Sequence, residues 1–258
     1  MRKYLLGYPV WQARMVMLEW VMAGIKENLN PAHVEVAFYM DEWTKGDRDM
    51  FKARMAEVLP EFRVTVDGGS HEIREIGCHN WFISRLMDGD QDCLIVPQDD
   101  VRLNGATMLA DLDRVLDQYG TNIGYIGMRE GYGCGYRQMM ASPFDAKIAG
   151  PGPVEELPIG TWRECEMINP GPLVYPRSTV ERIGSLDVSY HNWHWWSDYA
   201  LRAQKHGLKN GLLSINAAHE KSGEYRASRI IPDRDDWVAR DLSLLNRRWK
   251  PVMGHNVI

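Results

Sequence analysis

The sequence predicts an α/β fold, in which a mainly parallel central sheet is flanked by helices within one domain spanning residues 1–258. Strand-like and helix-like segments alternate over the first half of the chain, which is the pattern of such folds. The composition, 45% hydrophobic and 25% charged over 258 residues, is that of a globular chain with a sizeable core. No internal repeat or low-complexity linker divides it.

Apolar runs bounded by turn residues predict the strands, and apolar residues at spacings of three and four predict the helices. In the first half, strands are expected at residues 4–10, 33–40, 62–66, 93–96 and 123–126. Helices are expected between them at residues 15–25, 49–58, 74–87 and 106–119. The first helix is ended by Asn28-Leu29-Asn30-Pro31.

The second half is less regular. Residues 131–158 are rich in Gly and Pro and predict a long ordered loop, or lid, over a site. Ordered elements resume with a strand-like segment at 167–175, a helix at 178–183, a helix at 196–206 ended by Gly207, and a strand at 212–217.

Charge and cysteine usage restrict the class of protein. The net charge of −5 gives no electrostatic footprint for tight, non-specific binding of nucleic acid. The cysteines are widely spaced without a CxxC pair, which is typical of reduced thiols, and stand at Cys78, Cys93, Cys134 and Cys165. No apolar run approaches the ~18–20 residues of a membrane span. We therefore expect a soluble, cytoplasmic protein.

Polar residues follow two of the predicted strands. Ligands of parallel α/β sheets bind beyond the carboxyl ends of the strands, so Asp41 and the segment Gln98-Asp99-Asp100 are candidates for a site. Adjacent carboxylates are suitable ligands for Mg²⁺ or Mn²⁺. The alternative is that both acids favour the start of the following helix. This motif alone leaves both interpretations open.

A second candidate begins with three indoles, Trp193, Trp195 and Trp196, which precede Asp198 at the start of a predicted helix. A carboxylate beside bulky apolar groups can have a raised pKa and act as a general base, and indole faces are common platforms for sugar rings. Alternatively, Asp198 caps the helix and the indoles belong to the core. His219 follows a predicted strand, and such a histidine is by itself more typical of a loop than of a metal site.

Taken in order, these segments resemble the GT-A-fold, nucleotide-sugar glycosyltransferases, specifically the large inverting family that includes many bacterial and phage enzymes (glycosyltransferase family 2-like). The matching segments are Gly7–Trp11, Asp41, Gly77–Asn80, Val96–Val101, Gly184–Asp187, Trp196–Gly207, His219 and Asn246–Lys250. The resemblance implies metal-dependent transfer of a sugar from a nucleotide-diphosphate sugar, expected to be a UDP-sugar, to an acceptor hydroxyl with inversion. The sequence departs from the family pattern at Gln98 and Ser197, where acids are usual.

The resemblance also implies roles for individual residues. Asp198 is expected to be the catalytic base, and Asp100 with His219 to hold Mn²⁺ or Mg²⁺. Trp195 or Trp196 is expected to stack on the acceptor. Donor contacts are expected from Pro9, Asp41, Asn80, Asp99 and Trp249. Residues 1–127 would then form the nucleotide-sugar-binding half, and residues 128–258 the acceptor-binding half.

The acceptor stays open, with a saccharide or another hydroxyl compound expected. One alternative is glycosylation of hydroxymethylated bases in phage DNA, which the overall charge does not favour. Its phosphate-binding surface would be the basic C-terminal cluster of Arg226, Arg229, Arg234, Arg240, Arg247, Arg248 and Lys250, with which four aspartates interleave. Another alternative is a non-catalytic relative that binds nucleotides or carbohydrates.

Overall fold

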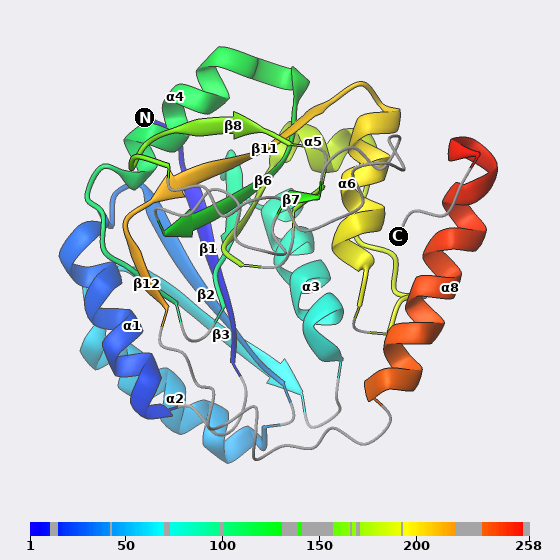
Figure 1. Ribbon diagram of the computed structural model, residues 1–258. Coiled ribbons are helices and arrows are strands. Elements are labelled where there is room, and N and C mark those ends of the chain that lie inside the picture. The colour runs from blue at the N-terminus through cyan, green and yellow to red at the C-terminus, as the bar shows by residue number, and fades with distance from the viewer. Residues whose placement is uncertain are drawn as a thin grey trace.

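A computed structural model describes residues 1–10, 15–41, 43–69, 73–98, 101–130, 139–140, 157–165, 167–168, 171–191, 193–219 and 234–254 of the chain. Its strands are β1 (Tyr4–Val10), β2 (Val34–Asp41), β3 (Arg63–Gly69), β4 (Cys93–Val96), β5 (Val101–Leu103), β6 (Ile123–Glu130), β7 (Met139–Met140), β8 (Trp162–Glu164), β9 (Met167–Ile168), β10 (Leu173–Pro176), β11 (Lys209–Ile215) and β12 (Ala217–His219). Its helices are α1 (Met15–Asn28), α2 (Lys45–Val58), α3 (Arg74–Asp88), α4 (Met108–Tyr119), α5 (Arg177–Ile183), α6 (Trp195–Lys205) and α8 (Arg234–Met253), with a short 3₁₀ turn at Gly120–Asn122 (Figure 1).

The central sheet confirms the predicted fold class. It has eight strands in the order β3-β2-β1-β4-β10-β6-β11-β8. The pairs among β3, β2, β1 and β4 are parallel, as is the pair β6–β11. Two strands run against their neighbours, since β10 lies antiparallel between β4 and β6 and β8 lies antiparallel at the edge beside β11. One sheet thus draws its strands from both predicted halves of the chain.

Helices cover both faces of the sheet (Figure 1). Along β1, alternate side chains enter opposite cores: Leu6 packs with α1, α2 and α4, whereas Leu5 packs with α3, α5, α6 and α8. Helix α3 lies so close to β1 that a Cβ built at Gly7 would stand 2.7 Å from the Phe82 ring. Glycine is therefore required there by the close approach of helix and strand.

The predicted elements of the first half agree with the structure to within a few residues. The short strands β5, β7, β8 and β12, the 3₁₀ turn and the long helix α8 were not predicted. The predicted lid at residues 131–158 lies largely outside the described residues. Within the described part of the chain, no helix is long and apolar enough to cross a membrane.

Elements distant in sequence meet at the edge where the parallel strands end. Helix α3 begins on this side, to the right of the ends of β1, β2 and β3 in Figure 1, and α6 begins on the same side. The two-stranded ribbon of β5 and β12 is antiparallel and brings His219 into register with Val101. The fold therefore gathers the carboxyl ends of the strands and two helix N-termini around one region.

Candidate functional site

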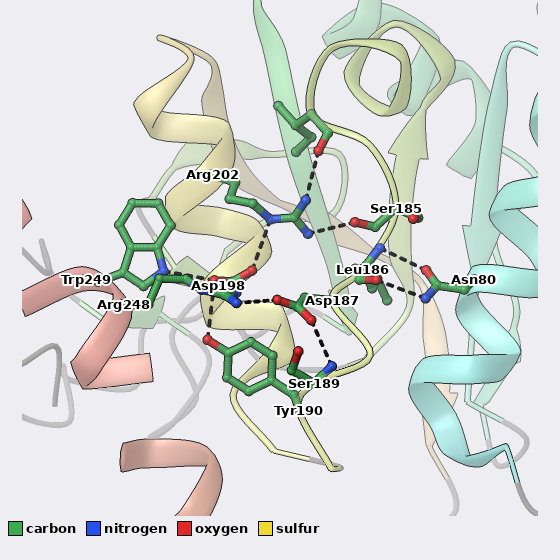
Figure 2. A network of polar contacts seen from close by, with 11 residues as sticks. Asn80, Ser185, Leu186, Asp187, Ser189, Tyr190, Asp198, Arg202, Arg248 and Trp249 are labelled. Carbon is green, nitrogen blue, oxygen red and sulfur yellow. Dashed lines mark hydrogen bonds and ion pairs between the residues drawn. The ribbon is translucent and has the colours of Figure 1, made fainter. Parts of the chain in front are cut away.

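Asp198 is the centre of a buried polar network between α6 and α8 (Figure 2). Its side chain is 0% exposed. One oxygen, Oδ2, accepts a hydrogen bond from Arg202 Nε at 3.0 Å. The other, Oδ1, accepts from Arg248 Nη1 and Trp249 Nε1, both at 2.9 Å, and from the Tyr190 hydroxyl at 3.3 Å. Both carboxylate oxygens thus accept hydrogen bonds from protein groups in place of water.

The two arginines extend this network to the turn before α6. Arg202 donates to the carbonyl oxygens of Ile183 and Ser185, both at 2.8 Å, and Arg248 also pairs with Asp187. Burial lowers the pKa of Arg248, but the hydrogen bonds to Asp198 and Asp187 outweigh it, so that this pKa is raised. Arg248 therefore stays charged and ties α8 to α6.

This geometry argues against the predicted role of Asp198 as the base. A base must reach the acceptor hydroxyl, and this carboxylate is enclosed and already bonded to two cations. Trp249, predicted to contact the donor, is 4% exposed and donates its indole N–H to Asp198. In the described conformation both residues hold helices together.

A second buried acid, Asp241, anchors α8 nearer its start. Its carboxylate is buried and accepts from the backbone N–H of His191 and of Trp193, at 2.9 Å each. Both donors lie in the segment just before α6. Helix α8 therefore holds this segment at two places, through Asp241 and through Arg248 with Trp249.

Asp41 ends β2 as predicted, but its carboxylate binds the start of α3. Its Oδ1 accepts from Ile73 N at 2.9 Å and its Oδ2 from Arg74 N at 3.0 Å. Asp41 is 2% exposed, which makes it a structural acid in this conformation rather than an open contact for a base or ribose. Arg74 is held with φ at 62°, and its Nη1 lies 2.6 Å from His191 Nδ1.

Asn80 and Pro9 also have structural surroundings. The Asn80 amide donates to Leu186 O at 3.0 Å and accepts from Leu186 N at 2.8 Å, which clamps the turn before α6 (Figure 2). Pro9 is buried in β1, where it is in register with Tyr39 of β2. Both side chains thus have contacts within the fold, and their predicted contacts with a donor stay predictions.

The two indoles predicted to hold the acceptor are part of the core. Trp195 is 1% and Trp196 is 7% exposed, with ring centroids 5.5 Å apart. Trp195 also packs against His79, at 4.8 Å between ring centroids. Burial lowers the pKa of His79 to about 3, so this imidazole is neutral near pH 7 and its Nδ1 bonds the Tyr175 hydroxyl. Since their faces are covered, Trp195 and Trp196 are not open stacking platforms in this conformation.

The predicted metal ligands are only partly visible. Asp99 and Asp100 lie outside the described residues, and His219 is described by its backbone alone. The register of β5 and β12 nevertheless sets His219 opposite Val101, the residue directly after Asp100. Among the side chains that the structure describes, no group of three or more His, Cys, Asp or Glu could hold a metal ion. For the predicted metal site, the described residues therefore show that β5 and β12, the strands beside its predicted ligands, pair with each other.

The architecture is shared with solved glycosyltransferase structures. A structure of GalNAc-T7 with UDP, GalNAc and Mn²⁺ matches 85% of this chain with a TM-score of 0.64 and 10% identity. The mannosyltransferase PcManGT from Pyrobaculum calidifontis, in complex with GDP-Man and Mn²⁺, matches 98% with a TM-score of 0.61 and 16% identity. A structure of S. aureus TarS, residues 1–349, matches 96% with a TM-score of 0.56 and 9% identity. The chain has the GT-A fold.

The match covers most of this chain, whereas this chain covers a smaller share of each solved structure. The chain spans 44% of the GalNAc-T7 chain, 68% of PcManGT and 72% of the TarS fragment. No protein-family model matches the sequence, and no curated protein matches it. At these identities the likeness establishes the fold.

Within this GT-A fold, sequence reasoning missed the residues that organise the site. Arg248 was placed in the matching segment Asn246–Lys250 and in the basic cluster, but without a partner, and Asp241 was one of the four interleaved aspartates and had no role of its own. The spacing Asp241, Leu245 and Trp249 places these three buried residues on one face of a helix. That spacing was the available signal for α8.

Proposed function

We propose that the protein transfers a sugar from a nucleotide-diphosphate sugar to an acceptor hydroxyl and requires Mn²⁺ or Mg²⁺. The fold supports this, because two of the similar structures hold a nucleotide or nucleotide sugar together with Mn²⁺. The observation that carries the proposal for this chain is the register of β5 and β12. It pairs His219 with Val101 and so brings a histidine beside the chain position that follows Asp99-Asp100.

In this proposal Asp100 and His219 hold the cation, with Asp99 close to the donor. Carboxylate oxygen and imidazole nitrogen are both ligands of Mn²⁺, so the residue types fit the ion. The bound cation would act as a Lewis acid that offsets the charge of the leaving diphosphate. A UDP-sugar is the expected donor, and a saccharide or another hydroxyl compound is the expected acceptor.

We further propose that Asp198 positions α6 and α8 instead of taking the acceptor proton. Its burial and its two arginine partners support this role. Inversion at the anomeric carbon is the outcome expected from the family resemblance. The anomeric configuration of the product, read by proton NMR, tests it.

The test of the metal site is nucleotide binding. We expect UDP or GDP to raise the melting temperature only when Mn²⁺ is present, by roughly 5–10 °C at a hundredfold excess over the dissociation constant. Asp100→Ala should abolish this shift, because it removes a ligand of the cation. Asp88→Ala, which removes an exposed acid at the end of α3, is the matched control and should retain it. A full shift in Asp100→Ala would exclude this residue from the metal site.

A further inference from the structure

The first turn of α6 has an unusual concentration of unused hydrogen-bond donors. Its N-cap residue, His194, has φ at 59° and makes no side-chain capping bond. The first hydrogen bond of the helix runs from Asp198 N to His194 O. In the part of the chain that the structure describes, the N–H groups of Trp195, Trp196 and Ser197 have no acceptor. Most helices satisfy some of these groups with a capping side chain.

Within the described residues, three side chains of the N-cap and first turn also have a buried polar atom that makes no hydrogen bond. Buried polar atoms with no hydrogen bond include His194 Nδ1, Trp195 Nε1 and Ser197 Oγ. Trp195 and Ser197 are each 1% exposed, so an unpaired polar atom on either side chain costs free energy. Helical Cα–Cβ bonds tilt toward the N-terminus, so the Cβ of Ser197 leans toward the end of α6 that carries the free N–H groups. Buried donors of this kind are rare unless something binds them.

The electrostatics of this turn favour a negative charge. The N-terminus of a helix carries a partial positive charge, and Asp198, the acid of the first turn, is already paired with Arg202 and Arg248. The Asp241 carboxylate is turned to the backbone N–H of His191 and Trp193. No acid of the described segment therefore caps the three N–H groups of α6.

The turn also lies where a ligand of this fold is expected. Arg74, at the start of α3, contacts His191 just before α6, and Asp41 at the end of β2 holds the backbone of Arg74. These contacts tie the start of α6 to the carboxyl ends of the strands, the edge at which α/β sheets bind their ligands. Arg74 adds a positive charge on this side.

We propose that the N-terminal turn of α6, with the Ser197 hydroxyl, binds an oxyanion. The ligand chemistry is a phosphoryl or carboxylate oxygen, which accepts bonds from backbone N–H groups and from the serine hydroxyl. Under the proposed function, on which this inference rests, the oxyanion belongs either to the diphosphate of the donor or to an acidic group on the acceptor. An acid at this turn in place of Ser197 would instead occupy the donors itself.

The test is calorimetric titration with inorganic phosphate in the absence of metal and nucleotide. Ser197→Asp should weaken phosphate binding by about tenfold, because its carboxylate competes for the same donors. Ser197→Ala should weaken it by about threefold and should fold normally, since the hydroxyl bonds no protein group. The matched control is Ser178→Asp in the first turn of α5. This helix starts beside Cys93, the first residue of β4, and therefore at the end of the sheet opposite to the carboxyl ends of the parallel strands. It should bind phosphate like the wild type.

A competition measurement separates the two sources of the oxyanion. If UDP or GDP with Mn²⁺ displaces phosphate, the turn binds the donor diphosphate; if both bind together, it binds an acidic acceptor. Equal phosphate affinity in the wild type, Ser197→Ala and Ser197→Asp would overturn the proposal, as would no phosphate binding in the millimolar range. Metal-dependent nucleotide binding by the wild type is independent of these results, so failure of the oxyanion site is distinguishable from failure of the proposed function.

Discussion

Replacing Asp198 by Asn distinguishes a structural acid from a catalytic base. All four groups that contact the carboxylate are donors, from Arg202, Arg248, Trp249 and Tyr190. In the asparagine variant one of the two oxygens becomes an NH₂ group, which must face a donor. The variant therefore loses an acceptor and a charge at the same buried point.

The expected loss follows from the burial of the pair. Removing one partner of a buried ion pair destabilises a protein by about 3–5 kcal/mol. The arginine side chains are 23% and 34% exposed, so solvent screens them and the loss should lie near the lower end, at about 3 kcal/mol. For a chain of this length that is a fall in melting temperature of about 6–12 °C.

The assay is thermal unfolding followed by circular dichroism, with Asp187→Asn as the control. Asp187 pairs with the same Arg248 but is 25% exposed, so its loss should be at most about 1 kcal/mol. Asp198→Asn with wild-type stability and no sugar transfer would refute the structural role and restore the predicted base. A large loss of stability in Asp198→Asn alone supports the account.

Three other predictions concern the packing around this region. Below pH 6.5 the unfolded chain protonates His79, while in the folded protein burial lowers the pKa of this group to about 3. The free energy of unfolding should therefore decrease as the pH is lowered, by about 2 kcal/mol between pH 7.5 and pH 5. Urea titrations at both pH values should show this loss, and a smaller one in His79→Gln; equal pH slopes in the two proteins would contradict it. Gly7→Ala places a methyl group against the Phe82 ring, so urea unfolding should show a loss of about 2 kcal/mol, which an unchanged midpoint would disprove. Trp249→Phe keeps the packing but removes the indole donor to Asp198, and should lower the free energy of unfolding by about 1 kcal/mol; a stability equal to that of the wild type would show that this bond contributes nothing.

Much of the fold could be predicted because it is encoded locally. β1 is a continuous apolar run and α3 repeats its apolar residues at helical spacing, and the predicted bounds of both differ from the structure by at most one residue. Helix α8 was missed because charged residues outnumber its buried ones, which obscures the spacing of Asp241, Leu245 and Trp249. The short strands β5 and β12 are specified by pairing with each other, and three-residue segments carry no periodic signal.

The roles of site residues were harder to predict than their positions. Asp198 does begin a helix and Asp41 does end a strand, as the sequence indicates. Their carboxylates are nevertheless occupied by groups 50 and 33 residues away, Arg248 N–H and Arg74 N–H. Such partners are chosen by tertiary packing, which no local pattern reveals. A motif therefore located these acids correctly without establishing what they bind.

The most direct test of the proposed function is consumption of a nucleotide sugar. The wild-type protein should release UDP or GDP from at least one sugar of a panel of UDP- and GDP-sugars, slowly with water and faster with an acceptor. Release should require Mn²⁺ or Mg²⁺ and should stop when the metal is chelated. Metal-dependent binding of a nucleotide sugar with no release from any of them, in the presence of saccharide acceptors, would contradict the transferase and identify a binding protein with a GT-A fold.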